Sequence, residues 1–167
     1  MICGKFPVRA ALILGCILFT AGRVGAVQGE DLVSHRPPGE GPTKIEVTLY
    51  LIDIMKVIDP EETFEADLFF IATWNDPRLS GTQMRTLPAS EVWMPNILVF
   101  NKRDASRDLP EVVTIQPDGT VVYRQRLIGT FAAHLDLHRF PLDAQTLQVQ
   151  LVSYGMNTDE VVLVESA

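Results

Sequence analysis

The stretch that decides the fold is "AHLDLHRFPLDAQTLQVQLVSYG", residues 133–155, in which a proline-centred turn separates two alternating runs. Upstream of the turn, odd-numbered positions carry apolar side chains: Leu127, Phe131, Ala133, Leu135 and Leu137. Downstream, the apolar positions alternate again: Leu147, Val149 and Leu151. A period of two is typical of a strand with one buried face. The stretch therefore predicts two half-buried strands joined at Pro141.

The turn itself is unusually apolar. Phe140 and Leu142 flank Pro141, which fixes its own backbone and restricts the residue before it. Turns are normally built from polar residues, glycine and proline. We expect another part of the protein to cover this turn, or the turn to cap the lower end of a sandwich core.

The first 26 residues have the pattern of a secretory signal peptide, with cleavage predicted after Ala26. Lys5 and Arg9 lead into an apolar run shorter than the ~20 residues needed to span a bilayer. Removal of this segment takes away both cysteines, so neither disulfides nor thiolate metal sites are expected in the mature chain. The net charge of −7 becomes more negative, which argues against nucleic acid as a partner.

The remaining 141 residues predict one all-β domain preceded by a flexible lead-in. Residues 27–42 are rich in proline and glycine and are expected to be extended or disordered. A domain over 43–167 is expected to contain about seven strands. The predicted strand regions are 44–55, 63–74, a broken strand at 91–101, the two arms of a hairpin turning at 116–119, the run after Pro141, and 160–164. The second half of the 44–55 strand is apolar on both faces, so we expect both faces to be covered there. A charged loop is expected between the broken strand and the hairpin.

Four motifs in fixed order carry a resemblance to a known family. They are "TWNDPRL" (73–79), "VWMPNILVFN" (92–101), "PDGTVVY" (117–123) and "RFPLDAQTLQVQLVSY" (139–154). Together they resemble the extracellular ligand-binding domain of pentameric ligand-gated ion channels, the Cys-loop receptor superfamily. Ala133 and Leu147 stand where animal members carry the loop cysteines, so the chain is similar to bacterial-type members without that disulfide.

The resemblance implies an immunoglobulin-like β-sandwich that assembles as a homopentamer. It also implies that the last two strands, the hairpin that caps the ligand and the membrane domain follow Ala167. The expected location is the periplasmic or extracellular face of the plasma membrane, and no cofactor is expected.

In this family the ligand lies between two subunits, in a box of aromatic side chains. By the resemblance, Phe100 and Tyr154 contribute from one subunit and Phe69 from its neighbour. Exposed aromatic rings attract cations, although the same rings could simply fill a subunit interface. Arg124 and Arg126 could bind a carboxylate ligand, or be plain solvated charges.

Other residues match family positions with structural or coupling roles: Trp74, Trp93 and Asp76 as scaffold, and Phe140, Pro141 and Leu142 as the loop that passes the signal to the pore. Asp59 and Asp143 resemble paired acids of a charged cluster; without their arginine, one carboxyl is expected to have a raised pKa. Glu62 lies where proton-gated members carry a proton-sensing glutamate.

Enzymatic chemistry is not indicated by the sequence, because no phosphate-binding loop or nucleophile motif is present. His134, Asp136 and His138 share one strand face, but their spacing of about 7 Å is long for one tetrahedral metal ion, so a solvated face is expected. Two hypotheses remain: the sensing domain of a channel gated by an amine, a carboxylate or protons, and a stand-alone secreted β-sandwich that binds its ligand without a pore.

Overall fold

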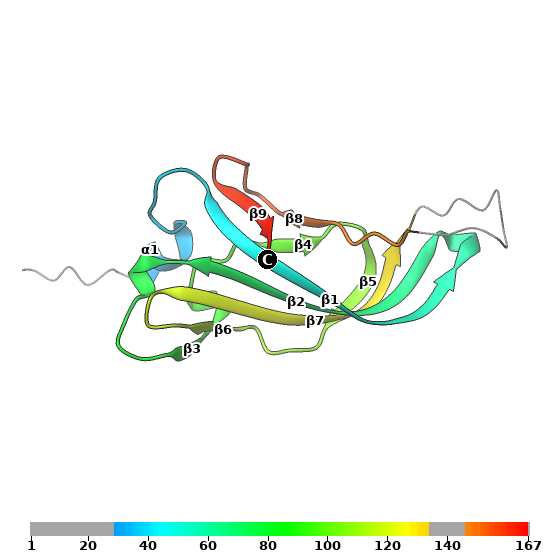
Figure 1. Cartoon of the computed structure of the whole chain (residues 1–167), viewed down its shortest axis with the longest axis horizontal. Helices are drawn as coiled ribbons and strands as arrows, with labels where there is room; N and C mark the ends of the chain where they lie inside the picture. The colour runs from blue at the N-terminus through cyan, green and yellow to red at the C-terminus, as the bar shows by residue number, and fades with distance from the viewer. Residues whose placement is uncertain (1–28, 134–145, 167) are drawn as a thin grey trace, which may run out of the picture.

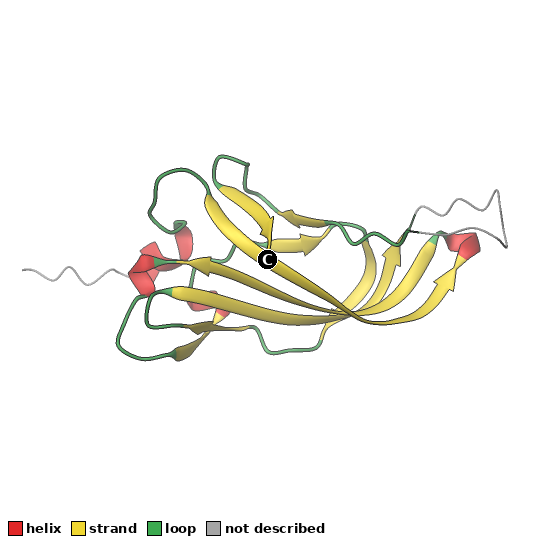
Figure 2. Ribbon diagram, in the orientation of Figure 1, coloured by secondary structure: helices red, strands yellow, loops and turns green. Residues whose placement is uncertain are grey.

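The computed structural model describes residues 29–133 and 146–166, with only the backbone considered for residues 29–31 and for Asp59. Strands dominate this part of the chain, and the few helical turns lie towards the two ends of the elongated molecule, the turn at 59–61 at one and the others towards the opposite one (Figure 2). The strands are β1 (Thr43–Ile58), β2 (Thr63–Asn75), β3 (Arg85–Pro88), β4 (Ile97–Val99), β5 (Lys102–Arg107), β6 (Val112–Ile115), β7 (Thr120–Ala132), β8 (Leu151–Ser153) and β9 (Val161–Glu165). The helical elements are α1 (Gly29–Ser34) and the 3-10 turns η1 (Asp59–Glu61), η2 (Pro77–Leu79) and η3 (Ala89–Glu91). The predicted all-β class is confirmed.

Seven strands form one twisted sheet in the order β3-β6-β7-β2-β1-β9, with β5 pairing a further stretch of β7. Long antiparallel ladders join β1 to β2 and β2 to β7, whereas β9 runs parallel to the first five residues of β1. Strands β4 and β8 form a separate two-stranded ribbon, which lies with β9 on one side of the long strands (Figure 1).

The core lies under alternate residues of the long strands, as the period of two predicts. On β2 the predicted inward set is buried: Leu68, Phe70, Ala72 and Trp74. On β7, Leu127 and Phe131 are buried, as is Ala133 just beyond its end. The inward face predicted from this alternation is confirmed within the described residues, while Leu135 and Leu137 lie outside them.

The prediction for the second half of β1 is wrong for this chain. Ile45 and Val47 are buried, but the strand was expected to be covered on both faces further along. Instead Tyr50, Leu51 and Ile52 are 52%, 56% and 53% exposed. This half of β1 lies beyond Val47, where its pairing with β9 ends and β2 is its strand neighbour among the described residues.

Three local expectations also differ from the structure. The charged loop contains a strand, β5, because its backbone completes the ladder along β7. The run after Pro141 becomes a strand only at Leu151, with residues 146–150 irregular. The lead-in contains helix α1, and Arg78 donates a hydrogen bond from its guanidinium to the backbone oxygen of His35 (2.9 Å), which ties this segment to the sandwich.

The hairpin between β6 and β7 forms as its turn residues predict. Gln116 N–H donates to the Thr120 carbonyl at 2.8 Å, and Gly119 has a φ of +86°. A Cβ at Gly119 would lie 2.6 Å from the carbonyl oxygen of Asp76, so the turn packs directly on η2. No helix of the described residues is long and apolar enough to cross a membrane.

Candidate functional site

The outward face of the large sheet carries an aromatic pair beside an arginine. Register pairs Tyr50 on β1 with Phe69 on β2, and Phe69 in turn with Arg126 on β7. The Tyr50 and Phe69 ring centroids are 6.2 Å apart, within the range of a favourable aromatic pair. We call Tyr50, Phe69 and Arg126 the outer row. Phe69 is partly exposed, as its predicted outward phase requires.

Arg126 is already engaged by two carboxylates. Its Nε and one terminal nitrogen donate to the two oxygens of Asp67 at 3.0 and 2.6 Å, a bidentate arrangement. The other terminal nitrogen donates to Asp108 at 3.3 Å. The hydrogen bonds from Arg126 hold the pKa of the Asp67 carboxyl below its ordinary value. A carboxylate ligand would have to displace Asp67 to use this guanidinium.

Arg124 lies two residues away on the same face and is in the opposite situation. Its register partner on β2 is Ile71, its side chain is exposed, and within the described residues no hydrogen bond or ion pair engages it. Of the two arginines singled out by the sequence, Arg124 is therefore the one whose guanidinium is available to an anion.

Phe100 and Tyr154 are exposed at opposite ends of the β4–β8 ribbon. Phe100 N–H donates to the Gln150 carbonyl at one end, and Tyr154 N–H donates to the Asn96 carbonyl at the other. Four residues of strand separate the two positions, roughly 13 Å. Their side chains are 72% and 69% exposed and line different cavities. A single chain thus presents these rings without joining them into one box.

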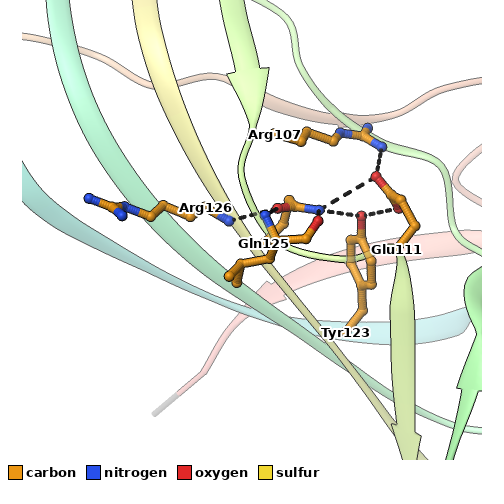
Figure 3. Close-up of polar contacts among 6 residues, drawn as sticks. Arg107, Glu111, Tyr123, Gln125 and Arg126 are labelled. Carbon is orange, nitrogen blue, oxygen red and sulfur yellow. Dashed lines mark hydrogen bonds and ion pairs between the residues drawn. The ribbon is translucent and has the colours of Figure 1, made fainter.

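Tyr154 lies at a cavity of about 550 Å³ whose polar residues are centred on a carboxylate. Figure 3 shows three side chains meeting there: the Tyr123 hydroxyl donates to one Glu111 oxygen at 2.6 Å, and the Arg107 guanidinium donates to the other at 2.7 Å. Ser90, Met94 and Leu98 are among the residues that line the rest. The volume falls in the range of small-molecule sites.

Hydrogen bonds keep Glu111 ionised although it is partly buried. Burial alone would raise the pKa of its carboxyl, but the bonds from Tyr123 and Arg107 lower it below the ordinary value. Burial and the bond to Glu111 raise the pKa of the Tyr123 hydroxyl. Each group therefore keeps its protonation state at neutral pH, with tyrosine as donor and glutamate as acceptor.

Gln125 fixes the loop that carries Glu111. It is fully buried, its amide oxygen accepts from the Leu109 N–H at 2.9 Å, and its amide nitrogen donates to the Leu109 carbonyl at 3.1 Å. The same amide oxygen accepts from the Arg126 N–H at 3.0 Å (Figure 3). The sequence reasoning missed this network. A signal was present, because Gln125 occupies an inward position of β7 where the alternation calls for an apolar residue.

The residues predicted to be scaffold are buried together near η2. Trp74 and Trp93 are 2% and 4% exposed and meet edge to face with centroids 6.2 Å apart. Asp76 is 1% exposed, caps η2 by accepting from the Arg78 N–H, and holds the Arg78 guanidinium at 2.9 and 2.7 Å. This cluster anchors the end of β2. Phe69 lies on the same strand, five residues before Trp74.

The predicted coupling residues are only partly described. Glu62 is exposed in the turn between β1 and β2, with a φ of +49°, and its carbonyl accepts from the Ala133 N–H at 2.8 Å. Phe140, Pro141, Leu142 and Asp143 lie outside the described residues, as do His134, Asp136 and His138. The Asp59 side chain is likewise not described, so the expected raised pKa stays a prediction.

The order of these elements matches a family profile across nearly the whole domain. Residues 32–167 match the neurotransmitter-gated ion-channel ligand binding domain. The chain belongs to this family. The family comprises ligand-gated ion channels, which are not enzymes.

Several curated channels resemble the chain at 30–34% identity. A "Proton-gated ion channel" of Gloeobacter violaceus is 34% identical over 145 residues, which cover 82% of this chain and 40% of that protein. The mouse "Gamma-aminobutyric acid receptor subunit theta" is 31% identical over 135 residues, 75% of this chain and 21% of the relative. The Drosophila melanogaster "Glutamate-gated chloride channel" is 30% identical over 142 residues, 76% of this chain and 31% of the relative.

The chain thus spans between about a fifth and two fifths of the length of these relatives. The part that it spans is the ligand-binding domain, with the outer row on one sheet and two exposed aromatic residues on the ribbon.

Proposed function

We propose that this domain senses a small ligand or protons at subunit interfaces of a pentameric ligand-gated channel, on the periplasmic or extracellular side of a membrane. The observation that carries the proposal is the family match over residues 32–167 together with two exposed aromatic side chains, Phe100 and Tyr154, and a partly exposed one, Phe69, on a separate surface. Phe69 belongs to the large sheet, whereas Phe100 and Tyr154 belong to the ribbon. Rings that do not meet within one chain can meet across two copies.

The contacts of the arginines favour an amine over a carboxylate as ligand of the outer row. Asp67 and Asp108 both pair with Arg126, so these three residues together carry a net charge of −1 beside the Tyr50 and Phe69 rings. Aromatic faces and carboxylates together attract organic cations. Arg124 remains as a group that a carboxylate ligand could use.

Protons are the second candidate stimulus. One relative is named a proton-gated ion channel, and Glu62 is exposed in the β1–β2 turn beside the start of the Pro141 loop. In this proposal Asp59, Glu62 and Asp143 respond to pH, and Phe140, Pro141 and Leu142 pass the change to a membrane domain of the same protein.

Electrophysiology on the full-length natural protein tests these proposals. Currents are recorded in lipid bilayers during steps from neutral to acidic pH, and with small amines or carboxylates at constant pH. Phe69→Ala and Tyr154→Ala are expected to raise the half-maximal amine concentration at least tenfold. Met84 is 69% exposed and lines neither the cavity at Tyr154 nor the cavity at Phe100, so Met84→Ala is the matched control and should leave the response unchanged.

The outcome separates the stimuli. A response to pH that is shifted by Glu62→Gln and untouched by Phe69→Ala supports proton sensing. A response to carboxylates that is lost in Arg124→Gln supports an anionic ligand. Absence of current under all these conditions, together with saturable ligand binding, would support a pore-free binding protein instead.

A further inference from the structure

A second cavity, of about 430 Å³, lies at the end of the sandwich where β7 finishes. The β1–β2 turn forms one wall with Glu61 and Glu62, and the start of β5 forms another with Lys102 and Arg103. Phe100, the most exposed aromatic ring of the described residues, precedes β5 by two residues and also lines the cavity. No side chain of the outer row lines this cavity.

Like Arg124, the four charged side chains that line this cavity have no side-chain partner among the described residues. All four are exposed, and within the described part of the chain none of them makes a hydrogen bond or an ion pair through its side chain. Other arginines on this domain are engaged, among them Arg107 with Glu111 and Arg126 with Asp67. Two carboxylates and two cations therefore face one cavity with their hydrogen-bonding capacity unused.

The cavity has a rigid base. The Asn101 amide donates to the carbonyls of Ala132 and Gln148, both at 2.8 Å, and its oxygen accepts from the Gln150 N–H at 3.0 Å. This side chain thereby joins the end of β7 to the segment that leads into β8. Ala132 and Ala133 present only methyl groups, which leaves room above them.

The balance of charge defines the occupant. A metal ion would be repelled by Lys102 and Arg103, and no group of three potential metal ligands occurs among the described residues. A simple anion would be repelled by the two glutamates, and a simple cation by the two basic residues. A molecule that carries both charges satisfies both walls through charge-assisted hydrogen bonds.

We propose that this cavity binds a small zwitterion of the amino-acid type, with its ammonium group at Glu61 and Glu62, its carboxylate at Lys102 and Arg103, and its aliphatic part against Phe100. The volume of 430 Å³ suffices for such a molecule. Because the charged groups are exposed, each contact contributes little and binding is in the millimolar range. The site lies within one subunit and shares Phe100 and Glu62 with the residues proposed above, but the binding of a zwitterion to it requires neither a pore nor a second subunit.

Saturation-transfer-difference NMR on the full-length natural protein tests the proposal, since it detects weak ligands of large assemblies. The probes are β-alanine, then acetate and methylammonium given separately at the same concentration. β-Alanine is expected to show saturable transfer, and the two half-molecules much less. The double variants E61Q/E62Q and K102Q/R103Q should each weaken β-alanine binding about tenfold, from roughly threefold per exposed contact.

Two controls keep the test decisive. K44Q/E46Q removes a similar pair of exposed charges from β1, outside the cavity, and should leave binding unchanged. The swap E61K/E62K/K102E/R103E keeps both charges and should restore binding with the zwitterion reversed. Equal transfer from acetate alone, indifference to both double variants, or equal loss in K44Q/E46Q would overturn the proposal. Phe69→Ala tests the interface site alone, so the two proposals fail separately.

Discussion

Replacing Gln125 by leucine tests whether the buried amide holds the loop that carries Glu111. The two side chains have similar volume, so packing changes little, but the Leu109 N–H and carbonyl lose their partners at 2.9 and 3.1 Å. A buried backbone group without a partner costs about 1–3 kcal/mol. Leu109 is partly exposed, so the lower end applies to each group and the expected loss is about 2 kcal/mol.

The measurement is the free energy of unfolding from urea titration, supported by thermal melting. A loss of this size corresponds to a fall of about 8 °C in melting temperature for a domain of this length. Gln148→Leu provides the matched control, because the Gln148 side chain is exposed and makes no hydrogen bond with a described residue. If Gln125→Leu and Gln148→Leu melt within 1 °C of each other, the buried amide does not hold the loop and the reasoning is refuted.

Three further outcomes follow from single contacts. Tyr123→Phe removes the 2.6 Å hydrogen bond to Glu111 and should lower the free energy of unfolding in urea by about 1.5 kcal/mol. The same change should raise the pKa of the Glu111 carboxyl, measured by NMR titration, and an unchanged pKa would contradict the network. Gly129→Ala brings a Cβ against the backbone of β5 and should cost about 2 kcal/mol or more, whereas a neutral effect would mean that β5 shifts freely. Arg126 lowers the pKa of Asp67, so the ion pair adds stability above the unfolded pKa of about 4, and this contribution disappears as the pH falls through the lower folded pKa. The stability gap between wild type and Asp67→Asn should therefore be large at pH 7 and narrow at acidic pH, and a constant gap would exclude this linkage.

Local patterning was sufficient for the strands that are buried on one face. On β2 and β7 the alternation of apolar and polar side chains identified both the strand and its inward face, because successive side chains point to opposite faces of a sheet. The turn chemistry of 116–119 likewise located the hairpin before β7. The outward position of Phe69 followed from the same parity.

The sequence could not predict features that depend on which strands become neighbours. Strand β5 reads as a charged loop, and it is a strand only because β7 offers a free edge to its backbone. Leu51 reads as a core residue, yet it is exposed on the part of β1 beyond Val47, where the pairing of β9 with β1 has ended. Both outcomes are set by register between distant segments, which no local pattern records.

By itself, the sequence determined the all-β class, the order of the motifs that identify the family, and the outward direction of Phe69 on β2. Only the tertiary structure decided that Asp67 occupies Arg126 while Arg124 stays available, that Phe100 and Tyr154 are held apart by the β4–β8 ladder, and that four unpaired charges share one cavity. The physical reason is that hydrogen bonds and ion pairs act over about 3 Å. Such contacts exist only after folding has brought together residues that lie far apart along the chain.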